Sequence, residues 1–430
     1  MKSGLDIATV FDDLDPVDFL DDAAVSVERS TSLGFEVHDR DDPATVLEEF
    51  AGWSRALSPA EERLRHDVLA LMKGTWLPIA AEHYQAGRFP SELFRELGRL
   101  GAIGASHVGP HGVPLRKRAA AALMHAVEYG DGGLRCALTI QDSVVQALVR
   151  FGSDEQRARW LEPLCRGEAI AAFALTEPDA GSDIRALSTR ARRRGDDWII
   201  TGKKGWITSA PHADLILVWA RTGERNEAIR GFLVERGTPG LEVETISSAT
   251  AMRAAPVGRI SLDQVAVPSR RMLPHAWGLT DINACLDYNR LTVIFGVMGA
   301  ARFCLEAAID HARRRVQFGA PIGSRQLIQA QLADMARAVC MGEMLSLELA
   351  RRWEEEPLSR FAVSLAKRNN CAEALAVARS ARSIMGAHGI DLANHVARHL
   401  LNLEASFTYG GTHEIHALVL GKILTGESAF

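Results

Sequence analysis

The feature that most constrains the fold is a stretch of almost continuous apolar residues late in the chain, at 291–309. A helix that is apolar nearly all round is expected at the centre of a helical bundle, where neighbours cover every face. No uninterrupted apolar run in the 430 residues reaches the ~20 residues that a membrane-spanning helix needs. We therefore expect a sizeable folded core and no membrane span.

Helical patterns also precede this stretch, from Ser58 to about residue 168. Ser58 can cap a helix, Pro59 suits the first helical position, and Glu61 completes a capping box. The pattern is interrupted at 109–114 and at the glycine-rich turn 130–133. These signals predict an N-terminal helical domain over residues 58–169.

Short β-branched runs bounded by Gly, Pro and Asp follow, which is typical of strands. They lie at 198–201, 215–220, 231–235 and 259–267. Beyond about residue 280 long helices return, with breaks near 319–324, 354–359, 386–389 and 410–411. The predicted fold class is α+β: the helical domain, a middle β-sandwich or β-barrel domain over 170–273, and a C-terminal four-helix bundle over 274–430.

Residues 1–57 are interpreted as an acidic extension without predicted structure. The first 50 residues carry fourteen Asp/Glu and three Lys/Arg, a net charge of −11 against −5 for the whole chain. The mildly basic remainder favours an anionic nucleotide ligand or an acidic carrier protein, and the lack of basic runs with aromatics argues against nucleic acid. The six cysteines form no C-x-x-C pair, so we predict no metal site and a cytoplasmic location.

Five motifs in a fixed order carry a resemblance to a known family. They are FALTEPDAGSD at 173–183, KKGWIT at 203–208, RVQFG at 315–319 with its continuation to 335, GAHG at 386–389, and YGGTHEI at 409–415. This set resembles the acyl-CoA dehydrogenase family and is most similar to its glutaryl-CoA dehydrogenase branch, through 131–144, 402–405 and 413–421. The acidic extension lies outside the resemblance.

The resemblance implies FAD as cofactor and a set of residues that hold it. A flavin needs hydrogen-bond donors near its ring, an aromatic wall, and dipolar or cationic partners for its pyrophosphate. The implied cofactor residues are Phe173, Leu175, Thr176, Ser182, Trp206, Thr208, Arg315, Gln317, Phe318, Gln329, Gly386, Thr412 and Glu414. The resemblance assigns residues 315–318 to a neighbouring subunit, which predicts a homo-oligomer, most simply a tetramer.

The resemblance also implies substrate-binding residues for an acyl-CoA or acyl-carrier-protein thioester. Asp287 and Arg290 fall where the family binds coenzyme A, and Ser182 and Tyr409 are expected nearby. Arg135 and Thr139 are four residues apart on an expected helix, hence on one face. They match the positions that bind the distal carboxylate in the glutaryl branch, which predicts a short acyl group that can end in an acid.

The family's catalytic base is absent from both of its known positions. In the family a Glu removes the α-proton while the β-hydrogen leaves as hydride to the flavin. The residue before the last Gly-Thr is Gly410, and the alternative position is Asn289. Neither side chain can accept a proton. The remaining candidates for a relocated base are Asp142, Asp287, Tyr288 and Tyr409.

Several functions stay open at this point. The first is dehydrogenation with an atypical or relocated base, which needs an electron-transfer partner. The second is a redox-neutral decarboxylation or desulfination in which Arg135 anchors the acid that is lost. The third is a flavin-dependent oxygenase or oxidase on the same fold, and the fourth is a catalytically silent subunit.

Overall fold

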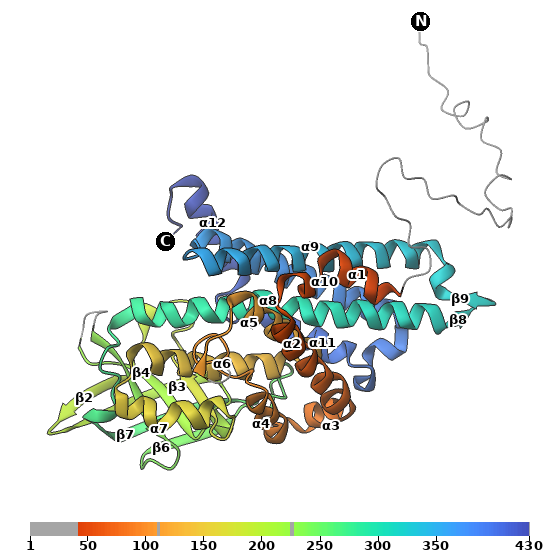
Figure 1. The fold of residues 1–430 in the computed structure, drawn as a ribbon. Coiled ribbons are helices and arrows are strands. Elements are labelled where there is room, and N and C mark those ends of the chain that lie inside the picture. Colours follow the sequence, from red (N-terminus) through yellow and green to blue (C-terminus); the bar gives the residue numbers. More distant parts are fainter. Residues whose placement is uncertain (1–41, 110–111, 224–227, 430) are drawn as a thin grey trace, which may run out of the picture. The chain divides into compact units, whose positions relative to one another are not determined.

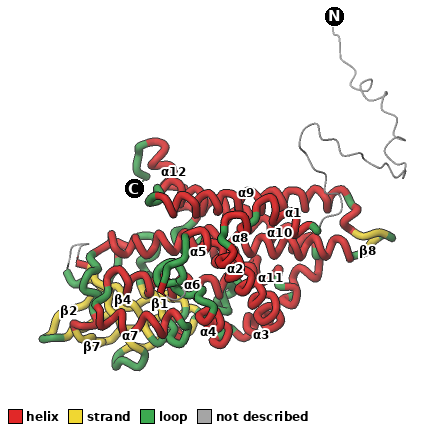
Figure 2. The backbone as a smooth tube through the Cα atoms, viewed as in Figure 1, coloured by secondary structure: helices red, strands yellow, loops and turns green. Residues whose placement is uncertain are grey.

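The structure is a computed structural model that describes residues 42–109, 112–223 and 228–429. Residues 43–430 form one compact unit. Its elements follow the order helices, sheet, helices, as Figures 1 and 2 show. The predicted α+β fold class is confirmed.

Two helices of the first part, α2 and α6, begin at signals found in the sequence. Ser58 caps α2: its side chain accepts from the Glu61 amide, and the Glu61 carboxylate accepts from the Ser58 amide. Asp131 caps α6 by accepting from the amides of Gly133 and Leu134. These helices are α1 (Pro43–Ala51), α2 (Pro59–Leu71), α3 (Leu77–Ala86), α4 (Ser91–Arg99), α5 (Lys117–Gly130), α6 (Gly132–Phe151) and α7 (Asp154–Cys165).

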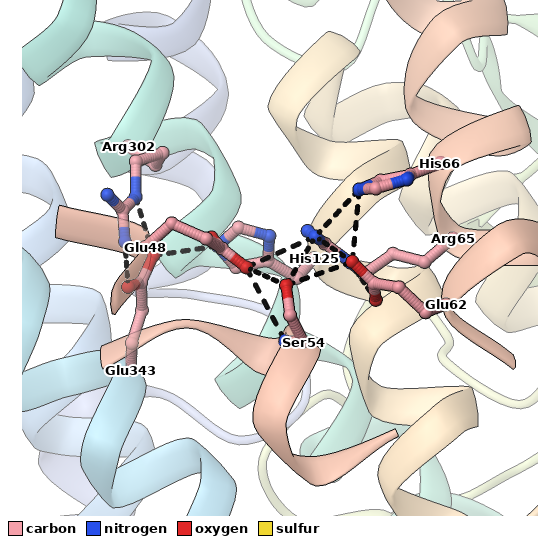
Figure 3. A network of polar contacts seen from close by, with 8 residues as sticks. All are labelled: Glu48, Ser54, Glu62, Arg65, His66, His125, Arg302 and Glu343. Atoms are coloured by element: carbon pink, nitrogen blue, oxygen red, sulfur yellow. Dashed lines mark hydrogen bonds and ion pairs between the residues drawn. The ribbon is translucent and has the colours of Figure 1, made fainter. Parts of the chain in front are cut away.

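The segment predicted as an extension contains a packed helix, which corrects the sequence interpretation for residues 43–57. Leu47 and Ala51 of α1 are buried among residues of the C-terminal helices, and Trp53 is buried among the N-terminal ones. A polar network reinforces this packing, because Glu48 accepts hydrogen bonds from Ser54 and Arg65 at 2.7 and 3.1 Å (Figure 3). The apolar residues of this short segment are too few to show a period, so the acidic composition dominated its interpretation. Residues 1–41 lie outside the described part of the chain.

The described strands of the middle part form one seven-stranded sheet, the arrangement that the sequence left open as a sandwich or barrel. The strand order is β1-β4-β2-β3-β7-β6. β5 lies outside this order and pairs with β4, which therefore has three partner strands. β1 and β2 run parallel to β4, whereas the other pairs are antiparallel. The strands are β1 (Ala171–Ala174), β2 (Arg190–Arg194), β3 (Asp197–Thr208), β4 (Leu215–Arg221), β5 (Ile229–Glu235), β6 (Leu241–Thr245) and β7 (Val257–Pro268).

The last part is built around α8, which contains the apolar stretch 291–309. Helices α9, α10 and α11 pack against α8, and α12 packs against α10 (Figure 1). α8 is long and apolar enough to cross a membrane by length and composition, but 78% of its most apolar window is buried inside the protein. That burial fits the predicted central position. The elements are α8 (Gly278–Arg314), the hairpin β8 (Val316–Gln317) and β9 (Ala320–Pro321), α9 (Gln326–Glu355), α10 (Arg360–Ile384), α11 (Val396–Ser406) and α12 (His413–Thr425).

Candidate active site

A cavity of about 570 Å³ lies where the sheet meets α6, α8 and the loop between α11 and α12. It brings together ten of the predicted site residues, although they are spread over almost 300 positions of the sequence. These residues are Arg135, Thr139, Phe173, Leu175, Thr176, Trp206, Thr208, Asn289, Tyr409 and Gly410. The two positions of the absent base therefore face the same space as the predicted flavin wall.

One wall of the cavity combines aromatic and aliphatic side chains with two threonines. β1 and the residues after it supply Phe173, Leu175 and Thr176, while β3 supplies Trp206 and Thr208. The indole of Trp206 is 62% exposed, and its backbone has a φ of 59°, a conformation that is costly for a bulky residue. An exposed aromatic side chain held in a strained conformation indicates that this wall is shaped for a ligand.

A buried ion pair fixes this wall from behind. Nζ of Lys204 donates to Oε1 of Glu177 at 2.9 Å and to the carbonyl of Leu175 at 3.0 Å. The amide of Gly205 donates to the carbonyl of Thr176 at 3.0 Å, which aligns the segment after β1 with β3. Burial lowers the pKa of Lys204 to about 8, and the Lys204 charge helps hold the pKa of Glu177 at about 2. A planar cofactor ring would lie against a rigid surface, so the residues present fit a flavin.

The opposite end of the cavity is polar and centred on Arg135. Its Nε donates to Oε2 of Glu128 at 2.5 Å, and its Nη1 donates to Oγ1 of Thr139 at 3.4 Å. Nη2 donates to the hydroxyl of Tyr409 at 2.5 Å. Arg135 and Glu128 are almost fully buried, and burial raises the pKa of Glu128 while the Arg135 charge opposes that rise. The cavity therefore ends at a guanidinium that is paired with Glu128 through Nε, while its Nη1 has only the long contact to Thr139 and can still donate to a ligand.

Glu128 was not identified from the sequence. It lies in the last turn of α5, after the run 119–127 that is apolar apart from His125, and a single acid next to such a run is the signal that could have identified it. Gly296 on α8 makes room for the pair: a Cβ there would lie 2.2 Å from Oε2 of Glu128 and 2.9 Å from Nε of Arg135. A glycine is needed at this point of α8 because two buried charged side chains press against its backbone.

The described residues that line the cavity include no carboxylate. Asn289 is buried and hydrogen-bonded to Ser143 on α6, while Gly410 has no side chain. Tyr409 does line the cavity, but burial raises its pKa well above 10. Cys136 also lines it, and burial raises the pKa of that thiol too. No described side chain in the cavity is thus suited to accept a proton at neutral pH.

The other candidate bases lie elsewhere. Asp142 is fully buried behind the cavity wall, where Oδ1 accepts from the Gly104 amide and Oδ2 from the Tyr288 hydroxyl, both at 2.6 Å. Burial raises the pKa of Asp142 to about 7 and that of Tyr288 well above 10. Because both oxygens of Asp142 are engaged away from the cavity, its prediction as a base near the substrate finds no support in this geometry.

A second cavity, of about 420 Å³, lies on the next face of α8. Asp287, Tyr288 and Arg290 line it together with residues of α10 and α12. Asp287 and Arg290 form an ion pair with each other. The two residues predicted to bind coenzyme A are thus together, one helical face away from the acyl cavity.

The remaining predicted residues are outside both cavities. Ser182 is exposed, as are Arg315, Gln317, Phe318, Gln329, Gly386 and Glu414. The side chain of Thr412 accepts from the Ile415 amide and so caps α12. Phe318 is 97% exposed at the tip of the β8–β9 hairpin. These residues are not brought together within a single chain. Among the described residues, no group of three or more His, Cys, Asp or Glu could hold a metal ion.

Comparisons with known proteins match almost the whole described chain. Residues 58–168, 172–265 and 277–425 match the N-terminal, middle and C-terminal domains of acyl-CoA dehydrogenase. The chain is 30% identical over 384 residues to the mitochondrial short-chain specific acyl-CoA dehydrogenase of Bos taurus, covering 86% of this chain and 93% of that protein.

Two solved structures from Mycobacterium smegmatis are similar in sequence and in fold. The crystal structure of a glutaryl-CoA dehydrogenase has a TM-score of 0.85 and 42% identity, covering 89% of this chain and 99% of that one. A glutaryl-CoA dehydrogenase in complex with FADH2 has a TM-score of 0.84 and 38% identity, covering 88% and 97%.

Proposed function

The chain belongs to the acyl-CoA dehydrogenase family, and from this premise we propose that it dehydrogenates a short acyl thioester without a carboxylate base of its own. Membership makes it a flavoprotein oxidoreductase that acts on CH–CH groups, with FAD as cofactor. The observation that carries the proposal is the lack of any carboxylate among the described cavity residues, in a cavity that otherwise keeps the predicted flavin wall and substrate end.

The residues at one end of the cavity would hold the flavin, and those at the other end would orient the substrate. Phe173 and Trp206 would exclude water from one face of the flavin, and Lys204 keeps their segments rigid. Arg135, held by Glu128 and Tyr409, would orient the far end of the acyl group, including one that ends in an acid. When bound, FAD supplies the acceptor for the β-hydrogen.

A second candidate is a redox-neutral loss of a terminal carboxylate or sulfinate held by Arg135. The same missing carboxylate favours it, because loss of CO2, or of SO2 that water then hydrates to sulfite, leaves a carbanion without removal of a proton, and this carbanion takes up a proton from water. It differs from dehydrogenation in leaving the flavin oxidised.

The test is anaerobic mixing of the FAD-loaded protein with butyryl-, isovaleryl-, glutaryl- and 3-sulfinopropionyl-CoA. The flavin absorbance near ~450 nm and the released CO2 and sulfite are followed together. Bleaching establishes dehydrogenation. Release of CO2 or sulfite with the flavin oxidised establishes the redox-neutral reaction instead. No response to any of these four thioesters would exclude both reactions for these substrates and would direct the search to other short thioesters, to a carrier-bound substrate or to oxygen chemistry.

Assembly and partners are part of the same proposal. The exposed apolar residues Val316, Phe318 and Leu327 at the β8–β9 end support contact with a second subunit there. A homotetramer, an electron-transfer partner, a carrier-protein thioester and a cytoplasmic location stay predictions.

A further inference from the structure

Lys367 on α10 is a buried cation that forms no ion pair with any described residue, although the carboxylate of Glu414 acts on it electrostatically. Its side chain is almost fully buried, and Nζ donates to the carbonyls of Ser406 and Gly411 at 3.1 and 2.6 Å. Across residues 42–109, 112–223 and 228–429, no Asp or Glu forms an ion pair with it. An ammonium has three donors and buried charges are normally paired, so this site lacks an anion.

Gly410 lies beside the side chain of Lys367 and leaves room for a small group there. A Cβ at Gly410 would lie 3.6 Å from Cε of Lys367, 3.9 Å from Cγ of Arg290 and 3.9 Å from Cγ2 of Val293, with no other atom nearer. These are ordinary van der Waals distances, and Gly410 itself lines the acyl cavity. A small group of the substrate can therefore occupy the place where most family members carry a side chain.

Arg290 adds a second unsatisfied donor at this place. One of its terminal nitrogens pairs with Asp287, but its Nε is buried and has no acceptor among the described residues. The contrast with Arg135 is clear, because the Arg135 charge is matched by Glu128 at 2.5 Å. Arg135 thus has a carboxylate partner, whereas Lys367 and the Nε of Arg290, both next to Gly410, have none.

We propose that the space between Gly410 and Lys367 binds a carboxylate, and that this carboxylate is carried by the α-carbon of the substrate. The substrate class is a 2-carboxyacyl thioester, that is, a substituted malonyl thioester. The inference rests on the proposed function, because position 410 is one of the two positions from which the family's base removes the α-proton.

The chemistry replaces removal of a proton by loss of CO2. The bond between the α-carbon and the carboxylate breaks, CO2 leaves, and the electron pair stays on the α-carbon as the thioester enolate. The β-hydrogen then leaves as hydride to oxidised FAD, and the enolate pair forms the α,β double bond. The products are an enoyl thioester, CO2 and reduced FAD, so atoms and electrons balance and no base is needed. An acid at the far end cannot do this, because its loss would not place the electron pair on the α-carbon.

Two thioesters that differ only in the α-carboxylate test the proposal. FAD-loaded, full-length protein is mixed anaerobically with butyryl-CoA or with ethylmalonyl-CoA labelled in the free carboxylate. We expect ethylmalonyl-CoA to bind about tenfold more tightly or better, as charge-assisted hydrogen bonds imply, and to bleach the flavin with one CO2 released per flavin. Butyryl-CoA should leave the flavin oxidised.

Variants separate the charge of Lys367 from its structural role. Lys367→Met should reduce the preference for ethylmalonyl-CoA to near one, whereas Lys367→Arg should keep it. If Lys367→Met does not fold, Gly410→Glu gives an independent test, because its carboxylate fills the same space and should reverse the preference in favour of butyryl-CoA. Acetate, titrated while the flavin spectrum and the melting temperature are followed, is the probe for a free carboxylate.

The outcomes distinguish failure of the inference from failure of the proposed function. Equal binding of both thioesters in the wild-type protein, or a preference that survives in Gly410→Glu, overturns the inference. Binding of acetate that depends on Lys367, without preference for ethylmalonyl-CoA, overturns the substrate assignment. Release of CO2 from ethylmalonyl-CoA without bleaching supports the carboxylate site but contradicts dehydrogenation.

Discussion

The guanidinium of Arg135 donates to the hydroxyl of Tyr409 at 2.5 Å and lies 5.5 Å from the centre of its ring. The contact joins α6 to the loop between α11 and α12 across 274 residues of sequence. That loop also carries Gly410, so the polar end of the cavity and the position of the absent base are fixed to one another. Changes at Arg135 should therefore affect both stability and substrate choice.

Replacing Arg135 by Met should destabilise the protein by about 3–5 kcal/mol, because Glu128 would remain buried without its counter-charge. Urea unfolding of the two proteins measures the loss. The double variant Arg135→Met/Glu128→Gln serves as the control, since it removes both charges and should regain much of that free energy. A loss below about 1 kcal/mol in the single variant would show that the pair is not coupled as the geometry implies.

Trp206 should be more important for holding FAD than for holding the fold. Trp206→Ala removes an exposed aromatic wall and should weaken FAD binding by about 0.5–1.5 kcal/mol, which fluorescence titration of the apoprotein can measure. Trp206→Gly should weaken FAD binding similarly, yet it should melt at a higher temperature than Trp206→Ala, because glycine adopts a φ of 59° without strain. Unchanged FAD affinity in both variants would remove Trp206 from the cofactor site.

The sequence predicted the elements whose signals are local. The Ser58 cap, the strand β7 and the breaks between α8, α9 and α10 all lie where composition and periodicity place them. β1, β2 and β6 were missed. Ala-Ala-Phe-Ala in β1 and Arg-Ala-Arg-Arg-Arg in β2 are poor strand formers, and they form strands through pairing with β4 and β3.

In the candidate site, too, residues with a local sequence signal were identified and residues without one were missed. Motif residues on β1 and β3 line the cavity, and Arg135 and Thr139, four residues apart on α6, line it as well. Glu128 and Lys367 were missed, because the importance of each depends on a neighbour distant in sequence. Glu128 on α5 faces Gly296 on α8, and Lys367 on α10 faces Gly410 in the loop between α11 and α12. No local pattern of residues encodes such a pairing.

Stability should depend on pH through Asp142. Its pKa is raised by burial from 3.8 to about 7, so the folded state keeps a proton that the unfolded state has released. The contribution to stability is complete below about pH 4 and is lost as pH rises to about 7, by up to about 4 kcal/mol. Asp142→Asn should remove this dependence, as unfolding in urea at pH 5 and pH 8 can measure.

Asp287→Asn, at an exposed aspartate of α8, is the matched control for Asp142→Asn and should leave the pH dependence of the wild-type protein intact. If Asp142→Asn and the wild-type protein lost stability in parallel between pH 5 and pH 8, the buried carboxyl would already be ionised in the folded state. The Tyr288 hydroxyl and the Gly104 amide would then stabilise the charge more than burial opposes it.

Gly410→Glu should create activity toward simple acyl-CoA. A Cβ at this position meets no atom closer than 3.6 Å, so the side chain fits, although a φ of 66° costs a non-glycine residue about 1–2 kcal/mol. The new carboxylate would stand in the cavity as a general base, which typically contributes about 10²–10⁴-fold to a rate. Anaerobic bleaching of the flavin by butyryl-CoA should therefore rise by at least about 100-fold over wild type.

Gly410→Gln has the same shape and the same backbone cost but accepts no proton, so it should gain nothing. If both variants stayed silent with FAD bound, the cavity would have been rebuilt for a different reaction, because supplying the missing base in the right place would not have restored the family's chemistry.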